Sequence, residues 1–559
     1  MSSTDLPAYL HGSRCGKACW ALAGLLGVAL VLRLWGIDYG LPFVYWTDEY
    51  HEVMRAMELG AGGFNFDRTG KGGFYLLLFL EYGMFFVVAK VSGVVASAGE
   101  FAELFAQDPT VFYLLGRVTA AVFGCATVAF AYFVAKRAYG LGAGLLAALF
   151  MAVNLLHVDL SHRVGVDIPM TLFVTMALYF GVRIAEGGGR GDYILAGLCA
   201  ALATTTKLPG IVVVVPLLIA HGYNVSGDGG AFRRFLTSPS VWVAVTLFAV
   251  VLIATNPGIL FADDLLSIFA ETGAESAEEL HDGAVRPNLW LYYVEKILAS
   301  TGWPLFVAFL GSAGYAIWKR KPADVMLLAF GAVTYVAISS TTSEKLYFPR
   351  YALPIVVVLS ILAGRALAEA LESFTRARAA VATFAVIAMI AWPLAQSIRF
   401  SYSLTLTDTR TLAKDWIDAH VPPNSKILIE GGKISATRTT VPLEESREAL
   451  DQRIAYWKSV EPRQAEYLAL KSRTQGKGGF DLELVRLDSV ETLDEYTDRG
   501  VRYFVVRPEY FLSSRRSDAG SAALVRELRS RKHVRLLQRF DPGSGLRPGP
   551  IIEIYESQR

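Results

Sequence analysis

The chain has 559 residues, of which 53% are hydrophobic and 19% charged, and its mean hydropathy is +0.38. This composition excludes a disordered chain and an ordinary soluble enzyme, because soluble domains carry about 25% charged residues. The net charge of +2 gives no sign of a nucleic-acid partner. The last 160 residues hold 49 of the 104 charged side chains. The sequence therefore predicts a membrane-embedded part, residues 1–399, and a soluble domain, residues 400–559.

Apolar runs along the first part predict a polytopic α-helical membrane protein, because a helix needs about 20 apolar residues to cross the hydrocarbon layer. A further apolar stretch at 73–95 is expected to form interfacial or re-entrant helices that make no net crossing. About eleven spans are expected, at 18–37, 111–135, 141–158, 166–184, 193–206, 209–222, 240–260, 290–318, 324–341, 351–371 and 379–398.

Lys and Arg predict the orientation, since they collect on the cytoplasmic side. Arg14 and Lys17 precede the first run, and no cleavage site follows it, so a retained span with a cytoplasmic N-terminus is expected. Lys136-Arg137 and residues 319–321 then fall on the same side. An odd number of spans places residues 400–559 outside the cytoplasm. The segments expected to face outward are 38–110, 159–167 and 262–289.

Two acidic sites lie in these outward segments. Asp48 and Glu49 follow the first span among aromatic residues, and Asp167 opens the span at 166–184. A carboxylate at the mouth of an apolar helix is costly unless it is paired or functional. Plainer explanations stay open: the first pair could be solvated at the headgroup level, and Asp167, followed by Pro169, could simply begin its helix.

Several cations are also expected on the outer side, against the usual charge distribution. They are candidates for binding an anion, although each could instead extend its charge to lipid headgroups. Carboxylates can accept a proton and cations can stabilise a leaving phosphate, so the set suits group transfer from a phosphate-linked donor. The cations are Lys71, Lys207, Lys345 and Arg350.

Six motifs in this order resemble the glycosyltransferase C superfamily, and more closely its protein O-mannosyltransferase family (glycosyltransferase family 39), which includes the lipid A aminoarabinose transferases. The resemblance covers about residues 15–400. The sequence departs from the family at Gly72-Gly73, where the family has Pro-Pro, and at Leu208, where it has Gly. The motifs are Asp48-Glu49, 66–73, 116–140, 161–169, 206–210 and 345–354.

The resemblance implies a glycosyltransferase that moves a sugar from a polyprenyl-phosphate donor to a glycan, lipid or protein at the outer face of the inner membrane. Asp48, Glu49 and Asp167 are the expected catalytic acids, with Asp48 as general base. The four cations are the expected lipid-phosphate contacts. We expect inversion by single displacement, and no strong general acid is needed because phosphate is a weakly basic leaving group. No cofactor is required; a divalent metal on Asp48, Glu49 and His162 stays open.

Residues 400–559 alternate between helix and strand patterns, which predicts an α/β domain. Its role is open between acceptor recognition, covering the active site and scaffolding. A lipid-linked sugar transporter or flippase, or a non-catalytic sugar-lipid binding protein, is the alternative to an enzyme. Few charges within the spans and the lack of a sequence repeat argue against a transporter. The expected elements are helices at 408–420, 491–498 and 519–530 and strands at 426–430, 501–506, 534–540 and 551–555.

Overall fold

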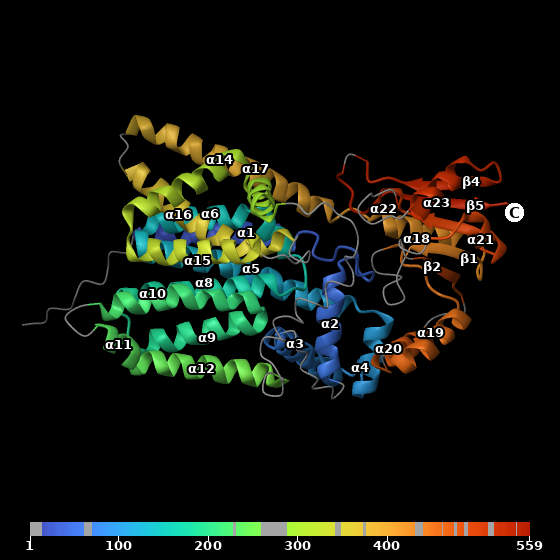
Figure 1. Cartoon of the computed structure of the whole chain (residues 1–559), viewed down its shortest axis with the longest axis horizontal. Helices are drawn as coiled ribbons and strands as arrows, with labels where there is room; N and C mark the ends of the chain where they lie inside the picture. Colours follow the sequence, from blue (N-terminus) through green and yellow to red (C-terminus); the bar gives the residue numbers. More distant parts are fainter. Residues whose placement is uncertain are drawn as a thin grey trace, which may run out of the picture.

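The described helices divide between a long bundle and a smaller region that also holds a β-sheet (Figure 1). The computed structural model describes residues 14–60, 70–226, 231–258, 288–340, 348–372, 376–430, 440–460, 462–474, 478–485, 490–511, 519–543 and 545–558.

Each of the eleven apolar runs contains a helix. Two of them run on from short 3-10 helices, η1 (Leu208–Val213) and η4 (Pro349–Ala352). The eleven helices are α1 (Arg14–Leu34), α5 (Thr110–Tyr139), α6 (Leu141–Val153), α8 (Asp167–Ala185), α9 (Arg190–Thr206), α10 (Val214–Val225), α12 (Pro239–Thr255), α14 (Leu289–Lys319), α15 (Pro322–Ser339), α16 (Leu353–Glu372) and α17 (Arg376–Ser403).

Ten helices of the described residues are long and apolar enough to cross a membrane. Nine of them belong to the eleven expected spans, while α6 has 13 residues and α9 has 17, which is short for a full crossing. The tenth is α3 (Gly72–Val91), which lies in the stretch expected to be interfacial. The chain is therefore a multi-pass integral membrane protein.

Helix α3 lies crosswise at one end of the bundle. Figure 1 shows it nearly end-on, whereas α8, α9 and α12 run across the view. Its first residues contact the ends of two spans, because Gly72 N donates to Asn256 Oδ1 (3.0 Å) and Gly73 N donates to Thr205 Oγ1 (3.1 Å). A Cβ at Gly72 would lie 1.8 Å from the carbonyl oxygen of Thr255. Glycine therefore fits where proline, which has no N–H, would lose both bonds.

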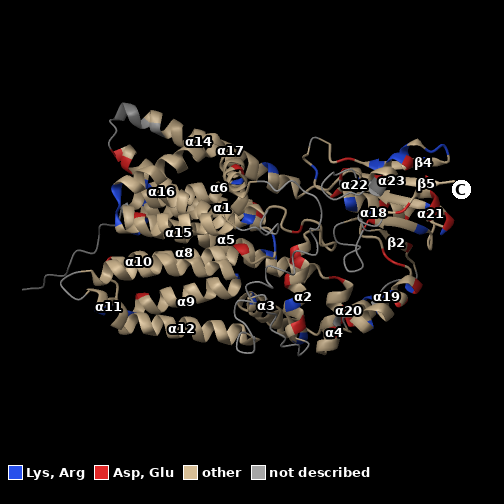
Figure 2. Ribbon diagram, viewed as in Figure 1, with Lys and Arg blue, Asp and Glu red and all other residues tan. Residues whose placement is uncertain are grey.

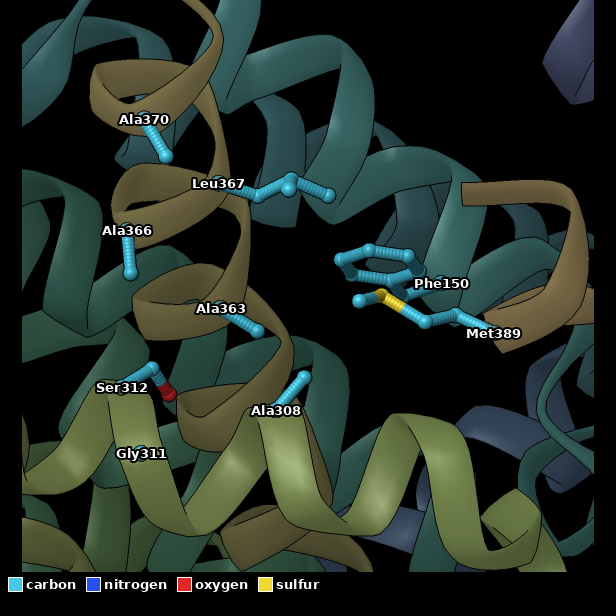
Figure 3. Close-up of a pocket in the computed structure, with 9 residues that line it drawn as sticks. All are labelled: Phe150, Ala308, Gly311, Ser312, Ala363, Ala366, Leu367, Ala370 and Met389. Carbon is cyan, nitrogen blue, oxygen red and sulfur yellow. The ribbon is translucent and has the colours of Figure 1, made fainter. Parts of the chain in front are cut away.

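Close contact between helices depends on small residues, as is usual in membrane bundles. Gly364 of α16 packs against α6, where a Cβ would lie 2.6 Å from the carbonyl oxygen of Ala143. Gly197 of α9 packs in the same way against Ala244 of α12. An apolar pocket opens between α6, α14, α16 and α17, and Figure 3 shows its lining residues. They are Phe150, Ala308, Gly311, Ser312, Ala363, Ala366, Leu367, Ala370 and Met389.

The sheet has five strands in the order β2-β1-β3-β5-β4. Strand β1 runs parallel to β2 and β3, and β5 runs antiparallel to β3 and β4. The sequence predicted all of these strands except β2. The strands are β1 (Lys426–Glu430), β2 (Asp481–Val485), β3 (Tyr503–Val506), β4 (Val534–Phe540) and β5 (Ile552–Ser557).

Helices cover the sheet, and the two sides of its strands belong to separate apolar clusters. Leu428 and Phe504 pack with α23 on one side, while Ile429 and Val505 pack with α18 on the other. The sequence also predicted α18, α21 and α23, but not α19, α20 and α22. The helices are α18 (Thr409–His420), α19 (Arg447–Val460), α20 (Pro462–Thr474), α21 (Leu493–Asp498), α22 (Pro508–Phe511) and α23 (Ala519–Ser530).

Within the residues that the structure describes, the sheet region contacts the rest of the chain at two separate places. Helix α18 follows directly from α17, the last helix of the bundle. Farther along, α20 packs on α4 (Ala98–Gln107), where the rings of Tyr467 and Phe105 lie 6.0 Å apart. We call the end of the bundle nearest the sheet the sheet-side end. Figure 2 shows the middle of the long helices largely free of charge, with charged residues at both ends of the bundle and over the sheet region.

Candidate functional site

Two carboxylates and two cations meet at the sheet-side end of the bundle, and we call these four residues the acid–cation cluster. Arg350 forms an ion pair with Asp48 through Nη1, and its Nε lies 3.9 Å from Asp167 Oδ2. Lys207 Nζ donates to Asp167 Oδ1 at 2.6 Å. Arg350 therefore bridges the two carboxylates that the sequence singled out.

Four separate segments supply this cluster. Asp48 lies in the first turn of α2 (Thr47–Gly60) and Asp167 in the first turn of α8. Lys207 stands between α9 and η1, and Arg350 lies in η4 just before α16. Carboxylates are favoured at the first turn of a helix, where the backbone N–H groups are unpaired. The ends of the spanning helices therefore build the site.

The members of the cluster differ in their exposure. The side chain of Asp48 is 59% exposed, whereas that of Asp167 is 10% exposed. Lys207 is largely covered, and its ammonium group lies 4.3 Å from the ring centre of Tyr351. Arg350 lies over the ring of Phe348 at 4.2 Å. Aromatic faces attract cations, so these two rings help to hold the basic groups in place. Asp48 is the carboxylate that a second molecule can reach.

Nearby cations keep Asp48 ionised. Partial burial acts to raise the pKa of Asp48, but Arg350 above all, together with Lys71 and Lys207, lowers it below its usual value. Lys71 itself donates to Glu52 at 2.7 Å. Burial would lower the pKa of Lys71, but Glu52 outweighs that effect and raises it. At neutral pH Asp48 is a carboxylate able to accept a proton, and Lys71 stays charged beside it.

Glu49, which the sequence put forward as a catalytic acid, does not join the cluster. It is 1% exposed, and Arg117 donates to both of its oxygens at 2.9 and 2.7 Å. The backbone N–H of Val164 donates to it as well, at 2.8 Å. Glu49 therefore joins the start of α2 to α5 and to the turn that leads to Asp167. With these partners the buried carboxylate of Glu49 ties the two segments that carry Asp48 and Asp167 to α5.

The other sequence-predicted residues divide into two groups. Lys345 lies outside the described residues, as do residues 66–69. His162 does not approach Asp48 and Glu49 as a metal site would need, because its ring nitrogens face the carbonyl oxygens of Val158 (2.8 Å) and Trp35 (3.2 Å). In the described part of the chain, no group of three or more His, Cys, Asp or Glu side chains could hold a metal ion.

Sequence reasoning missed the partners that hold these acids. Arg117 was noted only as part of a motif, although a charged residue within an apolar run is itself a sign of function or pairing. Glu52 lies one helical turn after Glu49, so the two side chains lie on the same side of α2. That spacing could have indicated a second buried acid in α2 and a partner for Lys71.

The chain is similar to known proteins in sequence over one segment and in fold over its whole length. Residues 101–257 match the family model described as dolichyl-phosphate-mannose-protein mannosyltransferase. The apo structure of ArnT from Cupriavidus metallidurans superposes with a TM-score of 0.50 and 14% identity, over 97% of this chain and 99% of that one. The chain therefore has the fold of ArnT. The predicted resemblance to the protein O-mannosyltransferase family is confirmed for residues 101–257.

Two further solved structures superpose with lower TM-scores. The apo oligosaccharyltransferase of Archaeoglobus fulgidus has a TM-score of 0.49 and 11% identity, over 90% of this chain and 71% of that one. The protein O-mannosyltransferase Pmt1–Pmt2 complex of S. cerevisiae has a TM-score of 0.28 and 17% identity, over 44% of this chain and 33% of that one. No curated protein sequence matches the chain significantly. The matched segment 101–257 contains Asp167 and Lys207 but neither Asp48 nor Arg350.

Proposed function

We propose that this protein is a membrane glycosyltransferase that moves a sugar from a polyprenyl-phosphate donor to a glycan, lipid or protein acceptor. The observation that carries the proposal is the bridge that Arg350 makes between Asp48 and Asp167, with Lys207 on the second acid. The matched family model is named for an enzyme that uses dolichyl-phosphate mannose. This name supports a sugar donor of the same chemical class.

The cations of the cluster are suited to hold the phosphate of such a donor. In the structure both are neutralised by carboxylates, Arg350 by Asp48 and Lys207 by Asp167. A phosphate monoanion or diester offers the same oxygen acceptors, and charge-assisted bonds from Arg and Lys are favourable to either kind of anion. The donor phosphate therefore competes with Asp48 for Arg350. Lys71, and Lys345 beyond the described residues, are proposed as further phosphate contacts.

Donor binding then prepares the base. Once the phosphate takes the guanidinium of Arg350, Asp48 loses the partner that holds its pKa down and becomes a better proton acceptor. An acceptor hydroxyl or amine attacks the anomeric carbon as Asp48 accepts its proton. The bond from that carbon to the phosphate oxygen breaks, and the lipid phosphate leaves with the electron pair. Attack from the face opposite the phosphate inverts the configuration.

Each remaining group has a part in this scheme. Arg350 and Lys207 stabilise the charge on the leaving phosphate, so a strong general acid is not needed. Asp167 holds Lys207 at 2.6 Å and keeps its charge beside the reacting atoms. Glu49 and Arg117 are positioning residues, since they lie behind the cluster and fix the segments that carry both acids.

The same proposal assigns the orientation. Lys136-Arg137 and residues 319–321 lie at the end of the bundle away from the sheet, which we place in the cytoplasm. The sheet-side end, with the cluster, then faces out from the inner membrane. Residues 1–399 form the catalytic membrane domain and residues 400–559 an extracytoplasmic α/β domain.

Sugar transfer can be tested directly with purified protein. It is incubated with a panel of polyprenyl-phosphate sugars and an envelope extract that supplies the acceptor, and the release of free polyprenyl phosphate is measured. With at least one donor, the unchanged protein is expected to release polyprenyl phosphate faster than the Asp48→Asn protein does. If no donor reacts although the protein binds polyprenyl phosphate, the proposal of an enzyme is wrong, and a transporter or a non-catalytic binding protein becomes the better explanation.

A further inference from the structure

The α/β domain makes a buried polar contact with the segment that leads to Asp48. Tyr39 Oη donates to Asp408 Oδ2 at 2.5 Å, and Tyr45 Oη lies 2.6 Å from Thr411 Oγ1. The guanidinium of Arg410 lies over the ring of Tyr45 at 3.8 Å and donates to the hydroxyl of Tyr39 at 3.2 Å. Both tyrosines and Asp408 are buried.

Asp408 is the centre of this contact. It caps α18 by accepting from the backbone N–H of Arg410 at 2.8 Å, and it accepts two bonds from the Arg410 side chain, also at 2.8 Å. With the bond from Tyr39, its two oxygens have four donors. Buried polar networks that are fully paired are rigid and specific, because each unpaired member would be costly.

The sheet holds the other side of the same helix start. Thr409 N donates to Pro548 O at 3.1 Å, and Thr409 Oγ1 donates to Pro550 O at 2.7 Å. Residues 548–550 lead directly into β5, which begins at Ile552. The start of α18 is therefore fixed by the sheet and presents Asp408, Arg410 and Thr411 to the first loop.

Further side-chain contacts connect Tyr39 and Tyr45 to the segment just before Asp48. The ring centres of Trp46 and Tyr39 lie 5.1 Å apart, and the guanidinium of Arg117 lies 5.0 Å from the ring centre of Trp46. Arg117 also donates to the carbonyl oxygen of Tyr39 at 2.8 Å. Residues 35–46 form turns and an irregular stretch, so their order depends on side-chain contacts such as these. Asp48 follows two residues after Trp46.

We propose that the α/β domain sets the position of the base, with Asp408 and Arg410 as positioning residues that act on Asp48 through Tyr39 and Tyr45. This inference rests on the proposed function and assigns a role to residues 400–559 in it. The domain orders a segment of the membrane part. A base displaced by about 1 Å can lose about 100-fold in rate without any change in donor binding.

Two variants test the contact, and each leaves the helix capped. Asp408→Asn keeps an N-cap side chain of equal quality but removes the charge that binds Arg410. Tyr39→Phe removes one hydroxyl and leaves Asp408 paired with Arg410. Asp418→Asn is the matched control, since it lies on the same helix and is exposed in an ion pair with Lys414 at 2.5 Å.

We expect Asp408→Asn and Tyr39→Phe to lower kcat by 10-fold or more while the KM for the donor stays within about threefold. The effect of Asp408→Asn should disappear when Asp48 is already Asn, because a residue that acts through Asp48 has nothing left to position. The proposal is overturned if kcat falls by less than threefold. It is also overturned if the KM for the donor rises while kcat stays constant. An undiminished effect in the Asp48→Asn background overturns it as well.

Amide hydrogen exchange separates this proposal from the proposed function. In Asp408→Asn protein the amides of residues 36–50 should exchange at least 10-fold faster than in the Asp418→Asn control. If exchange rises but the unmodified protein transfers no sugar, the ordering contact stands and the enzymatic function is wrong. If exchange and kcat both match the control, the ordering contact is wrong.

Discussion

Replacing Asp48 with Asn should separate catalysis from donor binding. The change keeps the size of the side chain and its ability to accept a bond from Arg350, but it removes the charge. General-base catalysis contributes about 10²–10⁴-fold in rate, so kcat should fall by that factor. Such a decrease corresponds to about 3–5 kcal/mol of lost transition-state stabilisation.

The same substitution should increase the affinity for the lipid phosphate. Asp48 competes with the phosphate for Arg350, and its side chain is 59% exposed, so the ion pair has the strength of a surface pair. Exposed pairs contribute about 0.2–1 kcal/mol. Removing this competitor should therefore tighten polyprenyl phosphate binding by about 1.4-fold to 5-fold, since 1.4 kcal/mol corresponds to tenfold.

Two measurements on the same detergent-solubilised protein check this pair of effects. Release of polyprenyl phosphate gives kcat, and titration with undecaprenyl phosphate gives the dissociation constant. Asp38→Asn is the control, because Asp38 is an exposed carboxylate ten residues upstream. Transfer within threefold of the unchanged protein, or binding weakened more than fivefold, would refute the assignment of Asp48 as a base held by Arg350.

Two further predictions concern the partners of these acids. Arg350→Gln removes the cation that holds the pKa of Asp48 down, so this pKa rises. The acid limb of kcat/KM, measured across pH, should therefore move to higher pH; a shift to lower pH would contradict the pairing. Glu49→Gln leaves the buried charge of Arg117 without its carboxylate and should lower stability by about 3–5 kcal/mol, measured by chemical or thermal unfolding. Glu58→Gln, on the same helix in a pair with Arg55, should cost less than about 1 kcal/mol, and equal losses in both variants would refute a special role for Glu49.

The sequence could predict much of the cluster because three of its four members lie at the ends of apolar runs. Asp167 and Lys207 begin and end neighbouring spans, and Arg350 precedes another, so their meeting at one end of a bundle follows from topology. The roles of Asp48 and Glu49 could not be separated in this way. Adjacent residues on a helix point about 100° apart, and only the docking of α2 against Arg117 decides which one is buried.

Other features depend on contacts that a single sequence does not display. The Gly72-Gly73 pair looked like a departure from the family, and its reason lies in the ends of α9 and α12, more than 130 residues away. Strand β2 alternates apolar and polar residues over only five positions, which is a weak signal. Helices α19 and α20 carry many charged residues; their apolar sides pack on each other, and α20 packs on α4 as well.

The two attachments of the sheet region have a mechanical consequence. A rigid body joined at one place turns on that hinge, whereas one joined at two separated places loses this freedom. Here α18 is joined to the bundle next to Tyr39, and α20 rests on α4 through Tyr467 and Phe105. A large swing of the α/β region would have to break one of these contacts. If the proposed function is right, cross-linking α20 to α4 should therefore leave turnover intact.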